Sequence, residues 1–234
     1  MKARVPAALA VALAALALAA APAAAPAQAQ TQRDWSRVVT LTPEGGYRMG
    51  NPQAPLKVVE YFSLTCPHCA DFAAEGAPRL IGTYVRSGRV SYEYRNFVLN
   101  GLDLAAAFIS RCAAPENYFA LSHAILAGQR EWMGRVSAMP AEQRRAMEGL
   151  EPLETMRRVI EIAGLDEIAA RHGVDAARAR TCLADQAGLD RIVQMQRAGA
   201  NFGIEGTPSF AINGRLAGSV RDWATLEPLL RPAR

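Results

Sequence analysis

A stretch of roughly 100 residues without strand signals, 101–201, interrupts this sequence and most constrains how the chain can fold. Before it, β-branched and aromatic runs at 56–62 and 89–97 flank a helical pattern. Strand, helix and strand at this spacing predict a βαβ unit with parallel strands. After the stretch, 206–219 returns to strand character with an Asn-Gly hairpin turn. We expect the strands on both sides of the helical stretch to form one sheet.

The remaining elements complete an α/β fold. A strand is predicted at 35–42, a helix from Cys66 to about Val85 with a kink at Pro78, and a last helix from the N-cap Asp222 to about Leu230. Within the helical stretch, helices are expected near 102–113, 116–128, 152–163, 175–184 and 187–200. This order is that of a thioredoxin-like sheet with an inserted all-helical subdomain. It would bring Thr207-Pro208 close to Cys66.

The N-terminus has the pattern of a secretory signal. Lys2 and Arg4 precede an uncharged run from Val5 to Ala21, and Ala27-Gln28-Ala29 offers small residues for a signal peptidase. We therefore expect a signal peptide at 1–29 and export of the chain, with a retained membrane anchor as the alternative. The mature part would comprise an N-terminal segment with the first strand, 30–49, and a thioredoxin-like domain, 50–234, interrupted at about 101–201.

Charge excludes two classes of partner. The full chain has 26 Lys+Arg and 22 Asp+Glu, and loss of Lys2 and Arg4 with the leader leaves 24 basic residues, a net charge of +2. This balance is too small to indicate binding to nucleic acid or to anionic lipid.

The four cysteines form two different kinds of pair. Cys66 and Cys69 are too close in sequence to constrain much chain, whereas a bond between Cys112 and Cys182 would close a loop of 71 residues. In an exported chain such a closure restricts the unfolded state by about 4 kcal/mol. We assign Cys112 and Cys182 to each other as a structural bridge, although four cysteines allow three pairings. Cys66 and Cys69 then remain for chemistry.

Cys-Pro-His-Cys at a strand-to-helix junction suits a reactive thiol pair. Cys66 would lie at the helix N-terminus, where unpaired N–H groups and the helix dipole stabilise a thiolate. Pro67 fits the first helical turn, and His68 lies between the sulfurs as a donor or cation. Cys69 falls on the same face but deeper, as a resolving thiol. Stabilising the thiolate makes the disulfide more oxidising, so the expected direction is disulfide donation to client thiols.

Other interpretations of the motif remain open. A structural zinc site needs four ligands, and the motif supplies three at most. Haem attachment needs His directly after the second Cys, where Ala70 stands. An inert structural disulfide is also compatible with the spacing. His123 and His172, in the helical stretch, are expected to be surface or satisfied helix residues. No metal and no cofactor are expected.

Glu60, in the strand before the motif, has two interpretations. If this strand is central in a sheet that is covered on both faces, Glu60 is buried near Cys69 and relays protons with a raised pKa. If the strand lies at an edge, Glu60 faces water. Periodicity does not separate the two.

The segments VVEYFSLTCPHC and GIEGTPSFAINGR, with the helical insertion between them, resemble the DsbA-like family of exported thiol-disulfide oxidoreductases. The resemblance runs from about Gly50 to the C-terminus. It implies that Cys66 is the nucleophile, Cys69 the resolving thiol, His68 the tuning residue and Glu60 the buried acid. It further implies that Pro208 is a cis-proline and that Thr207 contacts bound peptide.

The resemblance also implies partners. Reduced exported proteins would be the substrates of a monomeric periplasmic dithiol oxidase, and a quinone-linked membrane protein would reoxidise it. Thr207 departs from the valine of the best-known oxidases and is more typical of the isomerase branch. About 36 mature residues precede Cys66, too few for the dimerisation domain of that branch. A reductase or isomerase is therefore the alternative enzyme, and a chaperone-like or metal-carrying binding module is the alternative of another class.

Overall fold

The computed structural model describes residues 33–231, so the predicted signal peptide lies outside the described part. A six-stranded sheet has the order β1-β2-β4-β3-β5-β6. Only β3 and β4 pair in parallel, and each other neighbouring pair is antiparallel. The strands are β1 (Val39–Leu41), β2 (Tyr47–Gly50), β3 (Leu56–Phe62), β4 (Val90–Asn96), β5 (Ser209–Ile212) and β6 (Arg215–Leu216).

The predicted βαβ unit is present around β3 and β4. Helix α1 (Pro67–Arg79) follows β3, and its last turns continue as a π-helix, η2 (Leu80–Val85). Pro78 lies inside α1 just before this transition, where its missing N–H disturbs the regular ladder. The chain then returns along β4, parallel to β3.

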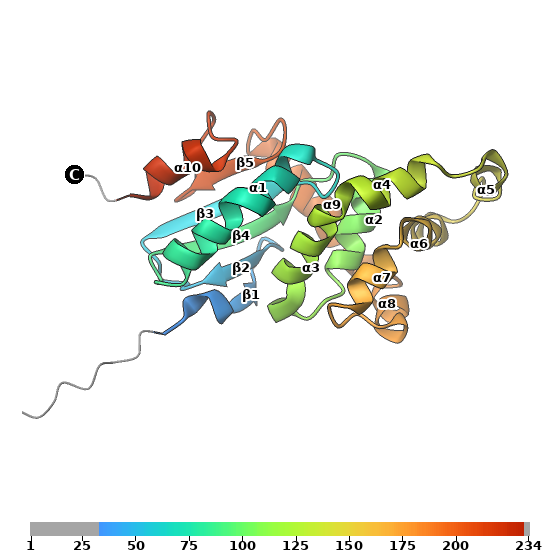
Figure 1. The fold of residues 1–234 in the computed structure, drawn as a ribbon, viewed down its shortest axis with the longest axis horizontal. Coiled ribbons are helices and arrows are strands. Elements are labelled where there is room, and N and C mark those ends of the chain that lie inside the picture. The colour runs from blue at the N-terminus through green and yellow to red at the C-terminus, as the bar shows by residue number, and fades with distance from the viewer. Residues whose placement is uncertain (1–32, 232–234) are drawn as a thin grey trace, which may run out of the picture. The chain divides into compact units, whose positions relative to one another are not determined.

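Helices cover both faces of the sheet (Figure 1), and β3 lies inside it, between β4 and β5. On one face α1 packs with α10 (Trp223–Leu230), and the Phe72 ring of α1 lies 4.8 Å from the Phe210 ring of β5. On the other face α9 (Gln186–Asn201) lies against β4, where Gly199 allows close approach to the Phe97 ring. Helix α10 begins as predicted, with the Asp222 carboxylate accepting from the Thr225 N–H at 2.9 Å.

The insertion between β4 and β5 is helical throughout its regular elements (Figure 1). Its helices are α2 (Gly101–Ser110), α3 (Pro115–Ala127), α4 (Gln129–Ser137), α5 (Ala141–Arg145), α6 (Pro152–Ala163), α7 (Leu165–Ala170), α8 (Ala176–Cys182) and α9. Helix α3 packs against α1 and so joins the insertion to the segment after β3. No helix in the described part of the chain is long and apolar enough to cross a membrane.

The predicted thioredoxin-like α/β fold with an inserted helical subdomain is confirmed, but several elements differ from the sequence prediction. The strand predicted at 35–42 is a 3-10 helix, η1 (Trp35–Arg37), followed by the short β1. The cause is Asp34, whose carboxylate accepts from the Ser36 N–H and closes a turn. Strand β2 was not predicted, because its sequence carries little β-branched character. Helices α4, α5 and α7 were also missed because each is short; packing supports α4 and α7, which contain buried residues, whereas α5 has none.

Candidate active site

Cys66 lies between the short segment that follows β3 and the first turn of α1. It is the N-cap residue of α1, with extended backbone angles, and Pro67 occupies the first helical turn. Both Cys66 and Cys69 are free thiols in this structure. The N–H groups of His68 and Cys69 face the Cys66 sulfur and lower the pKa of its thiol. The local sequence therefore places one cysteine where a helix terminus favours its charged form.

The two thiols have opposite acidities. A hydrogen bond from Cys69 is the largest cause that lowers the pKa of Cys66, to about 5, against the opposing effect of burial. Burial and the same hydrogen bond raise the pKa of Cys69 well above its ordinary value. At neutral pH Cys66 is thus a thiolate and Cys69 a thiol. This division of roles is what attack at one sulfur and resolution by the other require.

Thr207 and Pro208 meet Cys66 although they lie far away in sequence. Antiparallel pairing of β5 with β3 carries them to the start of α1, and the Thr207-Pro208 peptide bond is cis. When it is protonated, the Cys66 thiol donates to the Thr207 carbonyl, at a distance of 3.1 Å. The Thr207 side chain also lowers the pKa of Cys66, and within residues 33–231 its buried hydroxyl makes no other hydrogen bond. This hydroxyl is free to donate to a thiolate.

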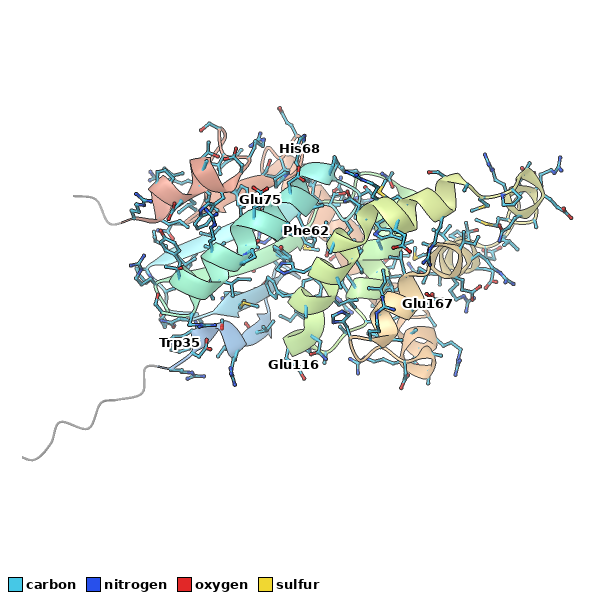
Figure 2. All side chains as sticks on the ribbon, viewed as in Figure 1. Trp35, Phe62, His68, Glu75, Glu116 and Glu167 are labelled. Carbon is cyan, nitrogen blue, oxygen red and sulfur yellow. A yellow bond between two sulfur atoms is a disulfide. The ribbon has the colours of Figure 1, made fainter. Side chains whose placement is uncertain are left out.

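His68 lies in the first turn of α1, near the top of the view in Figure 2. Its side chain is 76% exposed, and its Nδ1 lies 3.7 Å from the carboxylate of Asp71, one turn along the helix. Its backbone N–H, rather than its ring, contributes to the low pKa of Cys66. The imidazole is therefore at the protein surface.

Glu60 occupies the buried one of its two predicted environments. It is 1% exposed, on the face of β3 toward α1, and the Tyr92 hydroxyl donates to its Oε2 atom. Burial raises the pKa of Glu60 to about 8, against the lowering effect of the Tyr92 hydrogen bond. The charge of Glu60 also contributes to the raised pKa of Cys69. A carboxyl group that is largely protonated at neutral pH therefore lies beside the resolving thiol.

Three polar residues around the motif were missed by sequence reasoning. The Gln129 amide, at the start of α4, donates to the Leu64 carbonyl at 2.8 Å and to the Cys66 carbonyl at 3.0 Å. Asp103 of α2 accepts from the Leu64 N–H at 2.8 Å, and Tyr92 of β4 contacts Glu60. Gln129 and Asp103 show that the helical insertion holds the loop before Cys66. Nothing in their local sequence signals this, since the contacts depend on how α2 and α4 pack.

Cys112 and Cys182 form a disulfide with an S–S distance of 2.03 Å, the pairing that loop length favours. Cys112 follows α2, and Cys182 is the last residue of α8. Helix α8 has no fully buried residue among its seven, and the disulfide attaches it to the insertion together with the partly buried Ala179 and the Arg178 guanidinium, which donates to the Cys112 carbonyl. In the described part of the chain, no three His, Cys, Asp or Glu side chains gather as they would around a metal ion.

The acidity of Cys66 leads to a measurable prediction. The reduced protein is expected to react with iodoacetamide at a rate that rises with pH around a midpoint of about 5, because the thiolate is the nucleophile. Alkylation rates between pH 3.5 and 8, followed by mass spectrometry, measure this midpoint. Cys66→Ser is the control and should show no reaction in this range, since Cys69 stays protonated. A midpoint near 9, the ordinary value for a thiol, would contradict the assignment.

The lowered pKa of Cys66 also makes the stability of the reduced protein depend on pH. The folded-state pKa of Cys66 lies below its ordinary value, so the reduced protein gains stability over Cys66→Ser as pH rises from about 5 toward 9. That contribution is lost as pH falls through about 5. It belongs to the reduced form alone, because a disulfide does not titrate.

Comparison with known proteins agrees with this geometry. A family model described as Thioredoxin matches residues 42–231. The chain belongs to the thioredoxin family. A crystal structure of a protein-disulfide isomerase from Novosphingobium aromaticivorans is 31% identical, with a TM-score of 0.73 over 80% of this chain and 95% of that one. The structure of alpha-DsbA1 from Wolbachia pipientis shares the fold at 24% identity and a TM-score of 0.62, over 78% and 87% of the two chains.

Curated relatives have names that concern the same chemistry. A Rickettsia bellii protein that bears the provisional name protein-disulfide oxidoreductase is 31% identical over 172 residues, 71% of this chain and 56% of its own length. The chain thus spans about half the length of the curated relatives it matches. The predicted membership of a DsbA-like family is confirmed, and the chain is a DsbA-like member of the thioredoxin family.

Proposed function

We propose that this protein is a thiol-disulfide oxidoreductase that oxidises dithiols of exported client proteins through Cys66. The observation that carries the proposal is the unequal pair at the start of α1: a Cys66 thiolate at the helix N-terminus and a buried, protonated Cys69. The names of the Rickettsia and Novosphingobium relatives support the same class of reaction.

The proposed reaction passes through one mixed disulfide. A client thiolate attacks the Cys66 sulfur of the Cys66–Cys69 disulfide, and the electrons of the broken S–S bond leave on Cys69, which takes up a proton. A second client thiolate then attacks the client sulfur, and Cys66 leaves as a thiolate. The client loses two electrons and the enzyme gains them. The low pKa of Cys66 assists the second step, because a more acidic thiol is a better leaving group.

The remaining site residues have supporting roles in this scheme. Glu60 supplies the proton to Cys69, Pro67 shapes the first turn, and His68 meets the client at the surface. Thr207 and Pro208 contact the client peptide beside the sulfur. The predicted signal peptide and the structural disulfide support action in the periplasm on reduced exported proteins. Resemblance supports a monomer that a quinone-linked membrane protein reoxidises.

The direction of transfer is tested by equilibrating the Cys66/Cys69 couple with reduced and oxidised glutathione. We expect a reduction potential less negative than about −180 mV, since the thiolate stabilises the reduced form. The measurement uses the Cys112→Ala/Cys182→Ala variant beside the wild type, so that the second disulfide does not enter the readout. A potential near about −270 mV, which is that of a thioredoxin-type reductant, would overturn the oxidase direction.

A second candidate function is disulfide isomerase or reductase. Thr207 before the cis-proline favours it, as does the name of the Novosphingobium structure. This alternative predicts the low potential and a reduced resting state. Trapping the in-cell thiol state with an alkylating reagent separates the two, because an oxidase rests in the disulfide form.

A further inference from the structure

Four polar side chains run from the active site into the helical insertion: Glu60 on β3, Tyr92 and Tyr94 on β4, and His123 on α3. We call them the buried polar chain. Tyr92 donates to Glu60, and the Tyr94 hydroxyl lies 2.9 Å from Nε2 of His123. Tyr92 and Tyr94 point to the same side of β4, their ring centroids 5.0 Å apart and edge to face. The two rings are in contact, and each hydroxyl affects the pKa of the other, although in the described residues no direct hydrogen bond joins the two hydroxyls.

Exposure differs sharply along the buried polar chain. Glu60, Tyr92 and Tyr94 are buried, as is Cys69, which is 0% exposed. His123 is only partly covered. Of the four members, His123 is therefore the most exposed, and it lies on α3.

The proposed reaction creates a demand for protons at this buried site. Each client oxidised leaves one proton on Cys69, and Glu60 is the acid beside it. A client bound at Cys66 obstructs, without closing, the route by which solvent reaches the site past that sulfur. A second route by which Glu60 regains its proton would therefore speed turnover.

We propose that His123 is a positioning residue that returns protons from solvent to Glu60 through the hydroxyls of Tyr94 and Tyr92. The inference rests on the proposed function, because it concerns the proton that Cys69 takes up. It assigns to the helical insertion a part in the chemistry beyond its packing role.

The proton transfer balances without leaving a charge inside the protein. A buffer acid or water gives a proton to Nδ1 of His123, and the proton on Nε2 passes to the Tyr94 oxygen. The Tyr94 hydroxyl proton passes to Tyr92, and that of Tyr92 to the Glu60 carboxylate. His123 ends as its other neutral tautomer and Glu60 ends protonated. The hydroxyls reverse their orientation, which needs rotation about single bonds alone.

The surroundings of His123 and of Glu60, the two ends of the buried polar chain, fit the proposed proton transfer. Burial lowers the pKa of His123 to about 4, so its imidazole is neutral at physiological pH and can exchange one proton for another. Tyr94 from β4 is the titratable group that faces it, and the Phe119 ring packs against it from its own helix. Glu60 is faced by Tyr92 and Tyr94 from β4 and by Cys66 and Cys69 from the start of α1.

The test compares rates with equilibria in His123→Phe, His123→Gln and Tyr94→Phe. The oxidised variants react with reduced glutathione in stopped-flow mixing between pH 5 and 9, and quenched samples are alkylated to count released thiols. In dilute buffer we expect Cys69 release to slow about tenfold, less than the effect of a fully lost general acid because some solvent reaches the site past Cys66. Concentrated imidazole buffer should restore the rate.

The matched controls remove similar groups outside the buried polar chain. His172→Phe deletes the other histidine of the insertion, and Tyr118→Phe deletes a buried hydroxyl that donates to Asn96 instead. Both should react at wild-type rates. All variants should keep the wild-type equilibrium with glutathione within twofold, because a relay changes rates and leaves equilibria unchanged.

The possible negative results distinguish failure of the proton relay from failure of the proposed function. Wild-type rates in His123→Phe and Tyr94→Phe would overturn the inference, as would slowing matched by an equal change in the glutathione equilibrium, which indicates a structural role. Should His123→Phe not fold, Tyr94→Phe, which removes a single hydroxyl from the buried polar chain, decides in its place. Absence of any exchange in the wild type would instead contradict the proposed function.

Discussion

Replacing Cys66 by serine is expected to reduce oxidation of a reduced test protein to the uncatalysed background. Cys66 is the sulfur that the client attacks, and the raised pKa of Cys69 prevents it from substituting as a thiolate. The loss should amount to orders of magnitude, because the remaining thiol is both protonated and buried. The effect is measured as the rate at which the reduced test protein regains its own activity or loses its free thiols.

Cys69→Ser is the matched variant and separates the two cysteines. It is expected to attack a disulfide-bonded client and to accumulate the mixed disulfide at Cys66, since the resolving thiol is gone. Non-reducing electrophoresis with mass spectrometry identifies the trapped species. A Cys66→Ser variant that oxidised the test protein at the wild-type rate would refute the proposed mechanism. Trapping at Cys69 in place of Cys66 would reverse the two assigned roles.

Removing the second disulfide is expected to lower the free energy of unfolding by about 4 kcal/mol, because its loop constrains the unfolded chain. For a domain of this size that loss corresponds to about 10 °C in Tm. The Cys112→Ala/Cys182→Ala variant should keep its redox turnover, since the bond lies outside the residues that contact Cys66. Guanidinium unfolding, with Cys66 and Cys69 held in one redox state, measures the change.

The structure also locates where this destabilisation should begin. Helix α8 buries no residue of its own and is tied to the end of α2 by the disulfide. Hydrogen exchange in the variant should therefore rise first in α8. Cys66→Ala/Cys69→Ala, which removes a far shorter loop, is the control. Unchanged stability together with lost turnover would mean that Cys112 and Cys182 carry the chemistry.

Most of the framework could be predicted from local patterns. The strands around Cys66, the helix after it and the Asn-Gly hairpin follow from residue types within a few positions of each other. The elements that were predicted wrongly or not at all have local causes too. Asp34 turns the chain where β-branched residues favoured a strand, and β2 contains few β-branched residues. Short helices such as α7 exist because neighbours cover them.

What the sequence by itself determined is the chemistry available: a Cys-Pro-His-Cys motif at a strand-to-helix junction, a second distant pair of cysteines, and a split sheet that had to close around a helical insertion. Only the tertiary structure decided which environment each group has. The burial of Glu60, the contact of Tyr92 with it and the position of His123 depend on which helices cover the central strand. A side chain's pKa depends on residues that are near in space, and those come from β4, β5 and the insertion, far along the chain.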